Sequence, residues 1–139
     1  MNVIAKNLTD KQVMGWQFYF GDKLKGRISE ISSFKTFVIK ARSESSSLIR
    51  LTLMTSDAFA FSTDIKTGSQ WTEIRIPLTS LRIDSMMLLP RPYPGFLPLW
   101  FKAAGEANFR IEDAEKLQLI CIGEGKAAGL EIASIYLEK

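Results

Sequence analysis

Residues 71–80 read WTEIRIPLTS and decide the fold class. The apolar side chains of this stretch, Ile74, Ile76 and Leu78, fall on one side of an extended chain, and its charged side chains fall on the other. Such alternation predicts a half-buried β-strand rather than a helix. Pro77 removes one backbone donor, which suits a sheet edge or the exit from a strand.

The same period-two alternation recurs along the rest of the chain. It predicts further strands near residues 16–20, 37–42, 49–53, 59–63, 117–121 and 130–137. The polar run Ser43–Ser47 predicts a hairpin between two of them. The only helical turn that the sequence predicts is at Asp10–Met14. Short strands separated by turns predict an all-β, antiparallel jelly-roll β-sandwich, with a core built from Phe37, Ile39, Ile49, Leu51, Ile74, Ile76, Leu119, Cys121, Ile132 and Ile135.

The last predicted strand changes parity along its length. Leu130 and Ile132 set one parity, whereas Ile135 and Leu137 have the opposite one. All four can face the core only if an extra residue is inserted, so we expect a β-bulge near Ala133. A strand that is buried on both faces is the alternative.

Length and composition indicate one globular domain over residues 1–139. The hydrophobic fraction of 46% is enough to fill a core. The 18 basic residues are scattered among 15 acidic ones, so the basic patch of a nucleic-acid-binding protein is missing. No apolar stretch approaches the roughly 20 residues of a membrane span. Because no signal peptide is visible, we expect either a cytoplasmic protein or a domain excised from a longer extracellular or periplasmic chain.

Residue types argue against catalysis. The sequence has no histidine, which excludes Ser-His-Asp sites, Cys-His sites and histidine-bound zinc. Cys121 lies in an apolar run and is expected to be a small buried hydrophobe. Glu112, Asp113 and Glu115 lie in a turn before a strand, where carboxylates are normally solvated. We therefore expect no enzymatic activity from this chain.

The segment Leu88–Phe101, LLPRPYPGFLPLWF, is unlike the rest of the chain. Its prolines exclude a helix or a central strand, and they predict a stiff, extended loop. The aromatic side chains of this loop could close an open end of the core. They could instead form a platform for sugar rings, with neighbouring polar groups binding hydroxyls. A third reading is a ligand for a polyproline-binding partner. The predicted ligand-binding residues are Arg91, Tyr93, Phe96 and Trp100.

The three tryptophans have different expected roles. Trp71 precedes a strand and is expected to brace the sandwich. Trp16 shares its parity with two phenylalanines and is expected to pack on the core. Trp100 opens a polar stretch and is the best candidate for an exposed stacking residue.

Three segments together resemble a known family. They are Trp71–Pro77, of the form Trp-x-x-Ile-x-Ile-Pro, the segment Ile111–Leu119, and the closing strand Leu130–Leu137. This order resembles the galactose-binding-like β-sandwich, in the branch that holds family 11 carbohydrate-binding modules and the complex I intermediate-associated protein family. The resemblance covers about residues 34–82 and 108–138 and rests on structural motifs.

The resemblance implies a non-catalytic module that binds a polysaccharide or another glycan as an accessory domain of a glycan-degrading enzyme. The partner would then be a catalytic domain in the same parent chain, such as a glycoside hydrolase. No cofactor is expected, although many domains of this fold hold a structural calcium. No run of Asp, Asn and Gly here has the spacing of a calcium-binding loop. The alternative function is a protein–protein interaction or assembly module on the same sandwich.

Overall fold

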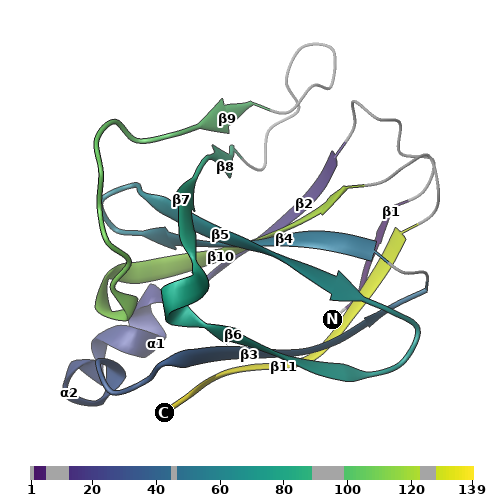
Figure 1. The fold of residues 1–139 in the computed structure, drawn as a ribbon, viewed down its shortest axis with the longest axis horizontal. Coiled ribbons are helices and arrows are strands. Elements are labelled where there is room, and N and C mark those ends of the chain that lie inside the picture. The colour runs from purple at the N-terminus through teal and green to yellow at the C-terminus, as the bar shows by residue number, and fades with distance from the viewer. Residues whose placement is uncertain (1, 6–12, 45–46, 89–98, 123–127) are drawn as a thin grey trace.

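The computed structural model describes residues 2–5, 13–44, 47–88, 99–122 and 128–139. Two antiparallel sheets pack face to face (Figure 1). The four-stranded sheet has the order β1 (Asn2–Ala5), β11 (Ala128–Glu138), β3 (Thr36–Ser43) and β6 (Thr72–Pro77). The five-stranded sheet has the order β2 (Val13–Tyr19), β10 (Ala114–Ile122), β4 (Ser47–Thr55), β5 (Ala60–Thr67) and β7 (Arg82–Asp84). The predicted antiparallel β-sandwich is confirmed.

A third layer is a small hairpin of β8 (Met86–Met87) and β9 (Trp100–Phe101). Figure 1 shows this hairpin beyond the five-stranded sheet, on the side away from the four-stranded sheet. Two short helices, α1 (Gly21–Lys25) and α2 (Ile28–Ile31), lie together at one end of the sandwich. Single 3-10 turns precede β7 and β10, namely η1 (Leu78–Ser80) and η3 (Ile111–Asp113).

The core lies between the two large sheets and follows the predicted alternation. The predicted core residues that are buried there are Phe37, Ile39, Ile49, Leu51, Ile76, Leu119, Cys121 and Ile132. Ile74 and Ile135 are partly buried and pack against this cluster. Burial raises the pKa of the Cys121 thiol, because the thiolate would lose its hydration. Cys121 is thus the buried apolar residue that the sequence predicts.

Strand β11 contains the predicted irregularity. Its pairing with β3 shifts register between Ile132 and Ser134, so that Ala133 is the extra residue. The shift lets Leu130 and Ile132 face the core on one side of the bulge and Ile135 and Leu137 on the other.

The predicted hairpin across Ser43–Ser47 is wrong. Strand β3 pairs with β6 and β11, whereas β4 pairs with β5 and β10, so the connection crosses from one sheet to the other. Alternation places side chains on faces, but it does not say which strands pair. The helices α1 and α2 were not predicted, because each is too short to show a helical period. The turn predicted at Asp10–Met14 lies mostly outside the described residues, and its last two residues belong to β2.

Candidate functional site

Gln118 holds the β8–β9 hairpin onto the outer face of the five-stranded sheet. Its neighbours in β10, Leu117 and Leu119, face the core, so the Gln118 side chain points outward. There Gln118 Oε1 accepts a hydrogen bond from the Met87 N–H at 2.9 Å. Its Nε2 donates to the Met87 carbonyl at 2.7 Å and to Gln17 Oε1 at 3.4 Å. Gln118 is fully buried as a result.

The hairpin exposes several large apolar side chains. Trp100 pairs with Met87 in the register of the hairpin, and the Leu88 N–H donates to the Leu99 carbonyl at 2.8 Å. Trp100 is 45% exposed, Phe101 43% and Leu99 47%. A ligand can therefore reach the Trp100 ring. The other predicted site residues, Arg91, Tyr93 and Phe96, lie outside the described residues.

A charged cluster lies on the same sheet face, beside the start of the hairpin. Arg50 in β4 donates to Asp64 in β5 through Nε at 2.9 Å and Nη2 at 3.2 Å, and its Nη1 lies 3.6 Å from Asp84 in β7. The hydrogen bonds from Arg50 lower the pKa of the Asp64 carboxyl, although partial burial opposes them. The same hydrogen bonds raise the pKa of Arg50. Arg50 and Asp64 therefore stay charged at neutral pH, and this Arg50 cluster can offer both donors and acceptors to hydroxyl groups.

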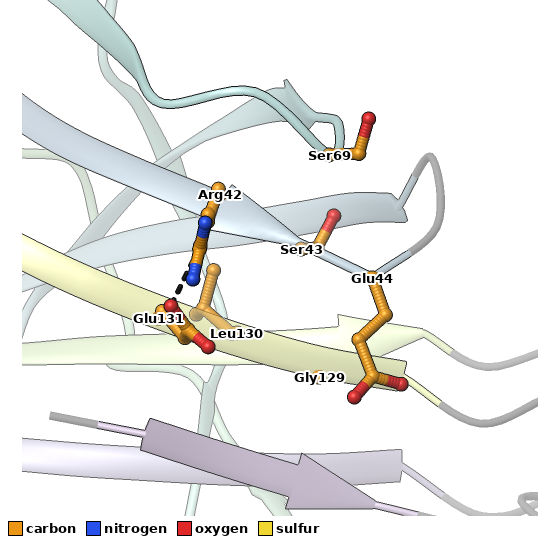
Figure 2. Close-up of a pocket in the computed structure, with 7 residues that line it drawn as sticks. All are labelled: Arg42, Ser43, Glu44, Ser69, Gly129, Leu130 and Glu131. Atoms are coloured by element: carbon orange, nitrogen blue, oxygen red, sulfur yellow. Dashed lines mark hydrogen bonds and ion pairs between the residues drawn. The ribbon is translucent and has the colours of Figure 1, made fainter.

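A second polar site lies on the four-stranded sheet, next to Trp71. Figure 2 shows a pocket between the end of β3 and the start of β11. Its volume is about 150 Å³, and it is lined by Arg42, Ser43, Glu44, Ser69, Gly129, Leu130 and Glu131. Arg42 Nε donates to Glu131 Oε2 at 2.6 Å. A Cβ at position 129 would lie 3.3 Å from the Glu44 side chain, so a larger residue there would have to push this exposed side chain aside.

The expected bracing role of Trp71 is wrong. Its side chain is 42% exposed, and the Arg42 guanidinium lies over its ring, 4.8 Å from the centroid. Arg42 is therefore held between an aromatic face and the Glu131 carboxylate. Sequence analysis missed this arrangement, because Arg42 and Glu131 meet only through the pairing of β3 with β11. Trp16, in contrast, packs against the core as predicted, and it stacks on Phe18 with 5.8 Å between ring centroids.

The remaining acidic residues do not converge within the described part of the chain. No three side chains of Asp, Glu or Cys come close enough there to hold a metal ion. Glu112 and Asp113 lie in η3, and Asp113 Oδ2 is 3.8 Å from Arg110 Nε. The carboxylates of Asp64 and Asp84 both face the Arg50 cation, which does not fit a calcium site. None of the helices in the described ranges is long and apolar enough to cross a bilayer.

Comparison with solved structures finds proteins with the same fold. The chain matches the family 11 carbohydrate-binding module of the cellulosomal cellulase Lic26A-Cel5E of Clostridium thermocellum, with TM-score 0.61 and 16% identity over 98% of this chain and 72% of that one. It also matches a family 11 module from the same organism in complex with a beta-1,3-1,4-mixed-linked tetrasaccharide, with TM-score 0.62 and 14% identity over 98% and 73%.

A third match is to PfGH50B. This match has TM-score 0.55 and 14% identity, and the aligned region covers 100% of this chain and 22% of PfGH50B. At these identities the likeness is one of fold, and the fold is that of family 11 carbohydrate-binding modules. No protein-family model matches the sequence, and no curated protein matches it significantly.

Proposed function

We propose that this chain is a non-catalytic carbohydrate-binding module whose glycan stacks on Trp100. The main support for this proposal is the exposed Trp100 ring, which lies on a hairpin that Gln118 fixes to the sheet. A flat aromatic face suits the C–H face of a sugar ring. The nearby Arg50 cluster supplies charged donors and acceptors for hydroxyl groups.

The segment that joins β8 to β9 contributes further contacts in this proposal. Tyr93 and Phe96 add ring surface, and Arg91 contacts hydroxyl or carboxylate groups of the glycan. Prolines in this segment restrict φ and so reduce the conformational entropy that binding must remove. A shallow stacked site buries little area, so the affinity of one module should be weak, roughly micromolar to millimolar.

The two carbohydrate-binding matches suggest a substrate for the first test. One matched module was solved with a beta-1,3-1,4-mixed-linked tetrasaccharide, and the other belongs to a cellulase. A domain of this fold also occurs within the much longer chain of PfGH50B. We therefore propose an accessory role beside a catalytic domain, and a β-linked glucan as the probe.

The test compares two tryptophans of similar exposure on opposite faces of the sandwich. Calorimetric titration with the mixed-linked tetrasaccharide should show a loss of at least about tenfold in affinity for Trp100→Ala, as expected when a stacking contact of about 1.4 kcal/mol or more is removed. Trp71→Ala is the matched control and should bind like the wild type. Both variants should keep the urea midpoint of the wild type.

Two results would contradict the proposal. If Trp100→Ala lowers the free energy of unfolding by about 3–5 kcal/mol, the ring is a core residue rather than a binding residue. If Trp71→Ala alone abolishes binding, the site is the Arg42 pocket of Figure 2.

One observation favours a second function, docking of a protein partner. Leu88, Leu99, Trp100 and Phe101 of the hairpin are all exposed, which is a large apolar surface for one short element. Leucines have no flat ring for sugar stacking, but they can bury apolar area against a protein. Leu99→Ala should leave tetrasaccharide affinity unchanged if the hairpin binds glycans. A partner of the parent protein whose binding is lost with Leu99→Ala would favour the assembly module instead.

A further inference from the structure

A large apolar cavity opens at the end of the sandwich where α1 and α2 lie. Its volume is about 670 Å³. Residues of α1, α2 and both sheets border it, and its lining consists of Phe18, Phe20, Lys23, Leu24, Arg27, Ile31, Phe34, Phe37, Ile111, Leu117, Ile135, Tyr136 and Leu137. This cavity is separate from both the Trp100 hairpin and the Arg42 pocket, with which it shares no residue.

The lining favours an apolar occupant over water. A buried water needs two to four polar partners, and most of these side chains offer none. The volume lies within the range of about 300–1,000 Å³ that is typical of small-molecule sites. A site of this size can take an extended hydrocarbon chain, which would cover the partly exposed apolar side chains of the lining.

The charged groups of the cavity are all cations. Lys23 and Arg27 line it directly, and Lys23 Nζ lies 5.1 Å from the centroid of the Phe18 ring. Lys139 Nζ lies 5.9 Å from the centroid of Phe34, a second ring of the lining. No acidic residue is among the described lining residues.

Nearby carboxylates do not neutralise these cations within the described ranges. The Asp22 carboxylate accepts a hydrogen bond from the Tyr19 hydroxyl at 3.3 Å, and Glu138 pairs with Arg75 at 3.2 Å. The ion pairs of the described residues do not include Lys23, Arg27 or Lys139. An anionic group at this position would therefore gain charge-assisted hydrogen bonds without displacing an existing pair.

We propose that the cavity binds a single-chain amphiphile with an anionic head, of the class of medium-chain carboxylates. The hydrocarbon chain lies against Phe20, Leu24 and Leu137, which are partly exposed lining residues. The carboxylate lies at the opening, where Lys23 and Arg27 can donate to it. This site is independent of glycan binding and takes a different ligand on a different part of the molecule.

The first experiment measures how chain length and head group change the affinity. Octanoate, decanoate and dodecanoate, each below its critical micelle concentration, displace a fluorescent anilinonaphthalene sulfonate from the wild-type protein. Each added methylene should tighten binding by about fourfold until the cavity is full. Dodecanol should bind more weakly than dodecanoate because it lacks the charge. Equal affinity for all chain lengths, or more than one high-affinity site, would overturn the proposal.

The second experiment changes the charge at the opening. The double variant Lys23→Glu with Arg27→Glu should lose at least about tenfold in dodecanoate affinity, because a repelled carboxylate replaces a paired one. Its dodecanol affinity should stay within about twofold of the wild type. The matched control, Lys66→Glu with Lys102→Glu, makes the same change of net charge at exposed positions away from the cavity and should bind dodecanoate normally.

Three outcomes would contradict the proposed amphiphile site. One is unchanged dodecanoate affinity in the Lys23/Arg27 double variant, and another is an equal loss in the control. The third is adsorption to vesicles of phosphatidylglycerol without uptake of monomeric dodecanoate, which would indicate a basic membrane-binding surface in place of a filled cavity. The circular dichroism spectrum of each variant confirms that a loss of binding is not a loss of fold.

Discussion

Gln118 shows how much the alternation of apolar and polar residues reveals about a single side chain. In the run Leu117–Ile122 it is the one polar side chain, and alternation alone predicts that it faces solvent. It does face away from the core, yet β8 covers it completely. The hydrogen bonds to both polar groups of Met87 explain why an amide is needed. Sequence gives the face of this residue, but it does not reveal the strand that covers the face.

Replacing Gln118 should therefore loosen the hairpin. Gln118→Leu leaves the buried N–H and C=O of Met87 without partners, and each group left unpaired costs about 1–3 kcal/mol. We expect a loss of about 2–4 kcal/mol in urea unfolding and faster amide hydrogen exchange at Met87. The control Gln17→Leu removes only the 3.4 Å contact and should cost less than about 1 kcal/mol. Wild-type stability in Gln118→Leu would show that β8 is held by other contacts.

Trp71 is a residue whose role the sequence does not predict correctly. The sequence predicts that its ring braces the sandwich, because a large aromatic side chain at the start of a strand usually packs on the core. The structure gives it a cation as its neighbour instead, in the form of the Arg42 guanidinium. An arginine and an aromatic residue far apart in sequence carry no signal of such a contact. The Arg42 pocket could not be predicted for this reason.

At the scale of elements, period-two alternation located most of the strands, because each large sheet has one face on the core. Pairing was harder, since partners such as β2 and β10 are far apart in sequence. The bulge in β11 was the exception, because an inserted residue changes the parity of the apolar positions around it. Parity is readable from one strand, whereas pairing depends on two.

Removing the extra residue should show that the bulge is required. Deletion of Ala133 shifts the parity of the rest of β11, which turns Ile135 and Leu137 away from the core. We expect a loss of about 2–5 kcal/mol, as for truncating buried aliphatic side chains. Ala133→Gly keeps the residue count, and it should cost no more than about 1 kcal/mol in urea unfolding. A deletion variant as stable as Ala133→Gly would mean that β11 tolerates either register.

At the scale of the whole molecule, the C-terminal strands complete both sheets. Strand β10 lies between β2 and β4 in the five-stranded sheet, and β11 lies between β1 and β3 in the four-stranded sheet. Figure 1 shows β10 alongside β4 in one layer and β11 alongside β3 in the other. Neither sheet can therefore form from the first part of the chain alone. Long-range pairing of this kind also makes folding slow, in the range of about milliseconds to seconds.

A chain divided between β7 and β8 should fold only when both parts are present. The fragment of residues 1–84 keeps β1 to β7 but lacks the inner strands, and with them the core side chains Leu117, Leu119 and Leu130. We expect its circular dichroism spectrum to be that of an unfolded chain, because two- and three-stranded remnants are at best marginally stable. Adding residues 85–139 should restore a β-sheet spectrum and one cooperative urea transition. A cooperative transition in the fragment 1–84 alone would show that the sheets do not depend on β10 and β11.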